Sequence, residues 1–187
     1  MNVKLLFGIC LAQATDVVTR VEPSQFDQPT PDTEWDVRQL AGHMLSELSW
    51  LPDLLTGQTV EAVGTKYDGD LIGSDLAGNW QTRADLASAM VAGVKLDQIV
   101  HLSYGNFPAE HYIHEQANDQ LIHAWDLGTA IGVDVKFDQA VATELYRAAW
   151  PRRDQLAASG LFAPALSVPD SADIQTKLLA LFGRRAQ

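Results

Sequence analysis

Residues 108–132, which read PAEHYIHEQANDQLIHAWDLGTAIG, predict one long helix. Pro108 suits the start of a helix, because its φ angle is already helical and its missing N–H is not needed there. Small and apolar residues recur at helical spacing on the side that should enter a core: Ala117, Leu121, Ala124 and Gly128. Gly132 can close the helix in the left-handed conformation that glycine tolerates. We therefore expect a helix from Pro108 to about Ile131.

Upstream, a second amphipathic helix follows the proline-bearing connection 23–31. Thr33 reads as its N-cap, with acidic residues in the first turn behind it. Gly57 is a natural stop, and Pro52 can kink the last turn. The apolar positions share one face, as expected of a core helix: Val37, Ala41, Met44, Leu48, Leu51 and Leu55.

Between and before these helices the pattern is less regular. Apolar residues at helical spacing predict a first helix that begins near Lys4 and continues to Val21. The glycine- and aspartate-rich stretch 57–79 reads as a loop with at most short helical pieces, and a third helix should cover 80–94. A brief strand-like pattern at 98–103 is followed by Gly105-Asn106, which reads as a turn.

Two further helices are expected near the C-terminus. Asp138 caps one that reaches Trp150, where Pro151 should kink or restart the chain. The last is amphipathic and covers 172–182. Several long helices with little strand pattern indicate an all-α helical bundle.

Composition excludes several classes of partner. A chain of 187 residues suits one domain with a substantial core. With 24 acidic against 13 basic residues the formal charge is -11, so the field repels nucleic-acid phosphates and anionic membrane surfaces. We therefore expect neither nucleic acid nor a membrane as a partner.

The N-terminal region indicates a cytoplasmic protein. The only cysteine, Cys10, cannot form an internal disulfide and lies in an apolar run. Lys4 and the apolar residues 5–11 imitate a short signal peptide, but the apolar stripe continues at helical spacing through Val17 and Val21. No run approaches the roughly 20 apolar residues that span a bilayer.

The long helix carries the densest set of candidates for chemistry. At about 100° per residue, Glu115, Asp119, His123 and Asp126 fall on one face. Asp119 and His123 are four residues apart, so they point the same way and can hold one ion. A carboxylate and a histidine at this spacing are, however, usually part of a solvated helix surface. The spacing leaves both interpretations open.

His43 lies at the border of the apolar face of the second helix. It can be a core-edge histidine that pairs with Glu47 one turn later. With Asp119 and His123 it would instead supply two neutral nitrogens and one anionic oxygen, leaving further coordination positions open. Such a set suits Zn²⁺, Ni²⁺ or Fe²⁺. An open position can polarise a substrate or lower the pKa of bound water or a thiol.

Three blocks of sequence, in this order, resemble the mycothiol-dependent maleylpyruvate isomerase N-terminal domain family, within the DinB-like superfamily. The first block is Thr30 to His43, TPDTEWDVRQLAGH. The second is Asp119 to Leu127, DQLIHAWDL, where relatives carry an acidic residue, three residues, a histidine and often Trp-Asp-Leu. The third runs from Leu161-Phe162-Ala163-Pro164 to Leu181-Phe182-Gly183-Arg184-Arg185 and is similar to a short metal-binding subgroup. Relatives often have cysteine at the position of Asp32.

The resemblance implies a DinB-like four-helix bundle with additional C-terminal helices. It implies a single domain over 1–187, in which about 1–135 form the bundle core and about 136–187 a helical extension. It also implies a divalent metal at one end of the bundle, first Zn²⁺ and otherwise Ni²⁺ or Fe²⁺, bound by His43, Asp119 and His123. Asp126 and Glu47 are candidates to support these ligands, for example by orienting an imidazole.

Two functions fit such a site. In one, an enzyme of the transferase or isomerase type binds the sulfur of mycothiol or another small thiol at the metal and presents it to an electrophile, with mycothiol as cosubstrate. In the other, a non-catalytic protein uses the same triad to bind a metal or ligand. A purely structural interpretation makes the three side chains surface groups. The oligomeric state stays open, with a homodimer among the options. Trp35, Trp50 and Trp125 could wall an apolar pocket or belong to the core.

Overall fold

The computed structural model describes residues 1–154 and 163–186. By its internal contacts the chain divides into two compact units, Asn2–Asp134 and Met1 with Val135–Gln187. Helices dominate the described residues, whose only sheet is a small two-stranded one, so the expected all-α class is confirmed. Leu161 and Phe162, which open the third sequence block, lie outside the described residues.

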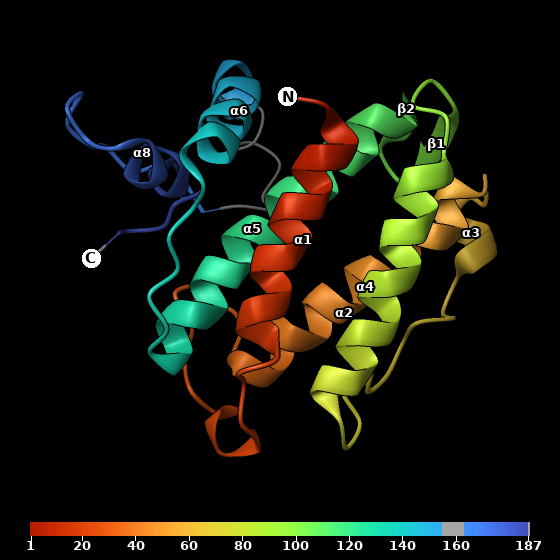
Figure 1. Ribbon diagram of the computed structural model, residues 1–187, viewed down its shortest axis with the longest axis horizontal. Helices are drawn as coiled ribbons and strands as arrows, with labels where there is room; N and C mark the ends of the chain where they lie inside the picture. The colour runs from red at the N-terminus through yellow and green to blue at the C-terminus, as the bar shows by residue number, and fades with distance from the viewer. Residues whose placement is uncertain (155–162, 187) are drawn as a thin grey trace. The chain divides into compact units, whose positions relative to one another are not determined.

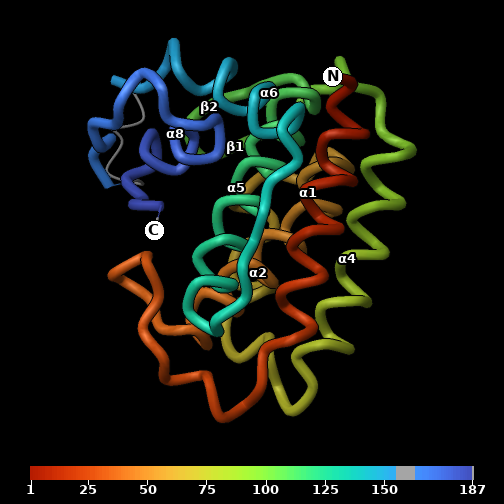
Figure 2. Tube along the Cα trace, turned by 60° about the vertical axis from the view of Figure 1, so that its left-hand side comes forward, coloured from red at the N-terminus to blue at the C-terminus, as the bar shows by residue number. Residues whose placement is uncertain are grey.

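Four long helices build the larger unit: α1 (Val3–Val18), α2 (Val37–Leu55), α4 (Leu76–Gly93) and α5 (Ala109–Ile131). Helix α1 packs against α4 and α5, and α2 packs against the same two helices, so the bundle closes on itself (Figure 1). Figure 2 shows these four helices from a second direction. The core comes from the apolar faces, and every apolar position predicted for α2 is buried.

Helix α2 begins later than its sequence suggested. The Asp36 side chain accepts the Gln39 backbone N–H at 2.8 Å, and the Gln39 side chain accepts the Asp36 backbone N–H at 3.0 Å. This reciprocal pair satisfies two N–H groups at the start of a helix. The prediction that Thr33 is the N-cap is therefore wrong, and Thr33 lies in the preceding turn. At the other end Gly57 follows the helix with φ +91°, as a stop should.

Other boundaries also differ from expectation. Helix α1 ends at Val18, so Val21 lies beyond it, and a 3₁₀ turn η1 (Pro23–Gln25) follows. Helix α4 begins four residues early because the Asp75 side chain accepts the Gly78 N–H. The loop after α2 contains the short helix α3 (Val60–Val63), in agreement with the prediction of at most short helical pieces there.

A hairpin precedes α5. Strand β1 (Ile99–Leu102) pairs antiparallel with β2 (Gly105–Pro108). The predicted turn at Gly105-Asn106 is wrong, because both residues belong to β2, where Asn106 pairs with His101. The turn lies at residues 103–104 instead.

The smaller unit contains α6 (Gln139–Ala149), a 3₁₀ turn η2 (Trp150–Arg152) and α8 (Ile174–Leu181). Asp138 caps α6 as expected, accepting N–H groups from Ala140 and Val141. Helices α6 and α8 pack together, and Leu178 and Leu179 are buried. None of the helices in the described part of the chain combines the length and hydropathy of a membrane crossing.

One contact between α1 and α4 generates a stability prediction. The buried Trp80 indole donates its N–H to the Thr15 hydroxyl at 2.8 Å. Thr15→Val keeps the shape but leaves the indole N–H without an acceptor, so unfolding free energy should fall by about 1–3 kcal/mol. Thr82→Val on exposed α4 surface is the control and should change it by less than about 0.5 kcal/mol. Urea unfolding measures both, and equal losses would contradict the prediction.

Candidate metal centre

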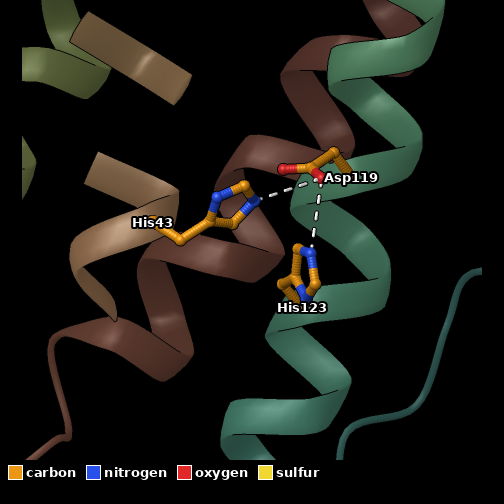
Figure 3. Close-up of side chains that lie close together, drawn as sticks. All are labelled: His43, Asp119 and His123. Carbon is orange, nitrogen blue, oxygen red and sulfur yellow. Dashed lines mark ion pairs between the residues drawn. The ribbon is translucent and has the colours of Figure 1, made fainter. Parts of the chain in front are cut away.

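Side chains from two helices meet at the candidate centre (Figure 3). His43 comes from α2, and Asp119 and His123 come from successive turns of α5. The distance from Asp119 Oδ1 is 3.5 Å to His43 Nε2 and 3.4 Å to His123 Nε2. The two imidazole centroids are 5.0 Å apart and nearly perpendicular. One donor atom from each residue lies within 4.8 Å of the others.

The donor atoms are shielded and incompletely satisfied. His123 is 5% exposed, and His43 and Asp119 are half-buried. His43 Nε2 and Asp119 Oδ2 are buried atoms without a hydrogen-bond partner among the described residues. Buried polar atoms are normally hydrogen-bonded, and a bound cation would satisfy both of these atoms. Two imidazole nitrogens and a carboxylate oxygen are ligands that Zn²⁺ accepts, so the residues fit a divalent ion.

Asp126 lies behind His123 on the same helix. Its carboxylate is fully buried and accepts the His123 Nδ1–H at 3.2 Å. A proton held on Nδ1 leaves Nε2, which faces Asp119, with the lone pair that a metal needs. The burial of His123 and Asp126 also argues against a solvated α5 surface at this point.

Glu47 does not pair with His43, although it lies one turn later on α2. Its Oε2 accepts the Gln116 side-chain N–H from α5 at 2.6 Å, and no hydrogen bond or ion pair joins it to His43 among the described residues. Burial raises the pKa of Glu47, and the Asp119 charge raises it further. The interpretation that Glu47 satisfies His43 is therefore wrong. Gln116 was not anticipated, because a glutamine at helical spacing carries no signal of its contact.

The charges of His43, Asp119 and His123 shift the pKa values of Asp119 and His123 strongly. Burial opposes ionisation of the Asp119 carboxyl, but the His123 and His43 imidazoles outweigh it and hold its pKa well below the usual range. Burial likewise disfavours a charged His123, yet the Asp119 and Asp126 carboxylates raise its pKa to about 10. A pKa of about 10 would keep both ring nitrogens of metal-free His123 protonated at neutral pH, so an incoming metal ion would have to displace the Nε2 proton.

A second group of donors adjoins the first. Asp32, His123 and Asp126 each place one donor atom within 4.8 Å of the others. Trp35, from the same turn as Asp32, stacks on the His43 ring with centroids 4.5 Å apart. Of the two other tryptophans considered as walls, Trp50 packs against Tyr67, and Trp125 is buried.

A hollow of about 540 Å³ borders His43. The loop 67–72 lines one part of it, and helix α2 contributes the five other lining residues: Arg38, Gln39, Gly42, His43 and Ser46. The Arg38 guanidinium pairs with Asp70 Oδ2 at 2.8 Å, at an exposed rim. Gly42 leaves room, since a methyl group there would lie 4.0 Å from Ile72 Cδ1, in ordinary contact. The hollow thus offers polar groups beside a candidate ligand.

The family model for the mycothiol maleylpyruvate isomerase N-terminal domain matches residues 7–128, a range that contains His43, Asp119 and His123. The chain belongs to this family. This DinB-like family takes its name from a mycothiol-dependent isomerase. The match begins within α1 and ends within α5, so it covers most of the four-helix bundle. No curated protein and no solved structure matches the chain.

The charge coupling predicts how this family member titrates without metal. The His123 imidazole should stay protonated through neutral pH and titrate near pH 10. The pKa of His123 is raised above its unfolded value of about 6.5, so protonated His123 stabilises the folded state. This contribution to the free energy of unfolding is fully present below about pH 6.5 and is lost as the pH rises through about 10. Histidine NMR titration of metal-free protein measures the pKa.

Asp119→Asn should lower the His123 pKa, because it removes the carboxylate that contributes most to raising it. Glu115→Gln is the matched control, since Glu115 pairs with His111 one turn away. An unchanged His123 titration in Asp119→Asn would contradict the coupling.

Proposed function

We propose that the protein binds one divalent metal ion at His43, Asp119 and His123 and uses it to bind a small thiol. The observation that carries the proposal is the convergence of three donor side chains from α2 and α5. Two of them, His43 and Asp119, each have a buried atom that finds no hydrogen-bond partner in the described part of the chain. Zn²⁺ is the first choice, because two imidazoles and one carboxylate form a common three-ligand set for a zinc ion that keeps an open position. Ni²⁺ and Fe²⁺ accept the same donors.

Two observations favour a thiol as the ligand: the family match and the incomplete coordination shell that three protein ligands would leave on the metal. The family model is named for mycothiol, and three protein ligands leave a tetrahedral ion one ligand short. A bound divalent metal would lower the pKa of a thiol, so that the sulfur is held as thiolate, a good nucleophile. Asp126 would keep His123 in the tautomer that presents Nε2. The hollow beside His43 is the space we assign to the body of the thiol.

We take the enzyme form, a thiol-dependent transferase or isomerase, as the proposed activity. A thiolate held beside a hollow can attack an electrophile that enters from solvent. A purely binding function would show thiol affinity without consumption of any electrophile. The compartment we propose is the cytoplasm, where thiols stay reduced and where the free, buried Cys10 has no disulfide to form.

Removing a ligand tests the metal. His123→Ala should weaken Zn²⁺ binding by more than the roughly 10- to 100-fold that loss of a supporting residue costs, and Asp126→Asn should fall within that range. Both variants should keep their helicity, because apolar faces build the bundle. Competition with a chelating dye measures affinity, and circular dichroism measures helix content.

His101→Ala is the control, because its ring bonds Asn106 in the hairpin. Unchanged Zn²⁺ affinity in His123→Ala would remove the proposed centre. Loss of helicity together with metal would show that the ion is structural.

Binding of a thiol tests the open position. Zinc-loaded protein should bind 2-mercaptoethanol and release about one proton per thiol at neutral pH, because the sulfur enters as thiolate. Calorimetry in buffers of different ionisation heat measures that proton. The same titration with metal-free protein should show no binding.

A variant that fills part of the hollow beside His43 tests whether the body of the thiol lies there. Gly42→Val should weaken binding of a bulky thiol more than binding of 2-mercaptoethanol, because the added methyl groups occupy the hollow next to Ile72. If zinc-loaded protein binds no thiol, a metal-binding protein without thiol chemistry is left.

A further inference from the structure

The two histidines of the candidate centre are held in different ways. His123 donates from Nδ1 to the buried Asp126 carboxylate, which fixes its ring. His43 makes no hydrogen bond through its ring among the described residues, and its Nε2 only approaches Asp119 at 3.5 Å. The His43 side chain is also more exposed than that of His123, at 25% against 7%. Something other than a hydrogen bond must therefore orient the His43 ring.

Trp35 is the group in contact with that ring. Its indole stacks on the His43 imidazole with centroids 4.5 Å apart and planes 27° from parallel. It also lies 5.7 Å from the His123 ring, tilted by 56°. One aromatic side chain thus contacts both imidazoles, in the offset or tilted arrangements that aromatic pairs prefer.

The turn that carries Trp35 is itself well fixed. Thr30 is 8% exposed, and its hydroxyl lies 2.8 Å from the carbonyl oxygens of both Asp32 and Trp35. The Trp35 N–H donates to the Asp32 carbonyl at 3.0 Å, and immediately afterwards Asp36 caps α2. The backbone that carries the indole is therefore fixed by hydrogen bonds within the protein.

From these contacts we infer that Trp35 is a positioning residue for the metal centre: its stacked indole holds the His43 imidazole with Nε2 directed toward Asp119. The inference rests on the proposed metal function. Trp35 does for His43 by stacking what Asp126 does for His123 by hydrogen bonding. A ring already held in place loses less side-chain freedom when it binds an ion, so the affinity is higher.

The test compares three replacements of Trp35 with a control on α2. Trp35→Ala and Trp35→Leu remove stacking, Leu keeping much of the apolar volume, whereas Trp35→Phe keeps an aromatic face. Co²⁺ is the probe, because its visible absorption reports the ligand geometry. Ala and Leu should weaken Co²⁺ binding about 3- to 10-fold, which corresponds to the worth of one aromatic pair, and alter the spectrum. Trp35→Phe should keep most of the wild-type Co²⁺ affinity and a spectrum close to that of wild type.

Trp50→Ala is the matched control on α2, because the aromatic partner of Trp50 is Tyr67, 6.1 Å between centroids, whereas Trp35 is the tryptophan that stacks on His43. It should leave Co²⁺ affinity and spectrum unchanged. In metal-free protein, NMR relaxation should show greater motion of the His43 ring in Trp35→Leu than in wild type, and circular dichroism checks that each variant is folded.

The outcomes separate the two proposals. If wild type binds Co²⁺ and folded Trp35→Leu binds it equally well with the same spectrum, the positioning role is overturned. An equal loss in Trp50→Ala would overturn it as well, since the effect would then be one of general stability. If no variant, including wild type, binds Co²⁺, the metal function fails, and the His43 ring motion alone decides whether Trp35 holds the ring.

Discussion

The packing of α2 against α5 is the constraint on which the candidate centre depends, because it brings His43 and Asp119 together. The side of α5 that meets the core combines the large residues Ile113 and Leu121 with the small residues Ala117, Ala124 and Gly128, and all five are buried. A deep helix also buries part of its polar face. The coupled charges of Asp119 and His123 follow from that burial.

Periodicity and capping residues predicted most of the fold. Gly132 ends α5 in a left-handed conformation, and Asp138 caps α6, because each residue type has a local physical reason to stop or start a helix. Local rules failed where two residues competed. Thr33 and Asp36 are both good N-caps, and only the reciprocal partner Gln39 favours the later one. Gly105-Asn106 suits a turn, yet pairing across the hairpin places it in a strand.

The candidate centre was predictable in part. The spacing of Asp119 and His123 shows that they share a helix face, but not that the face is buried, which depends on neighbours far along the chain. The resemblance of the block Thr30 to His43 to the family implied that His43 is a ligand, because nothing in α2 alone distinguishes a ligand from a core-edge histidine. Contacts such as Gln116 with Glu47 and Trp35 with His43 arise only when distant segments pack, so no local pattern announces them.

The capping box at the start of α2 also sets the rotational phase of the helix. His43 lies two turns after Asp36, and each residue added between them would turn the imidazole by about 100° and move it about 1.5 Å along the axis. The ring would then face neither Asp119 nor Trp35. Insertions and deletions between Asp36 and His43 should therefore be rare among proteins that keep this centre.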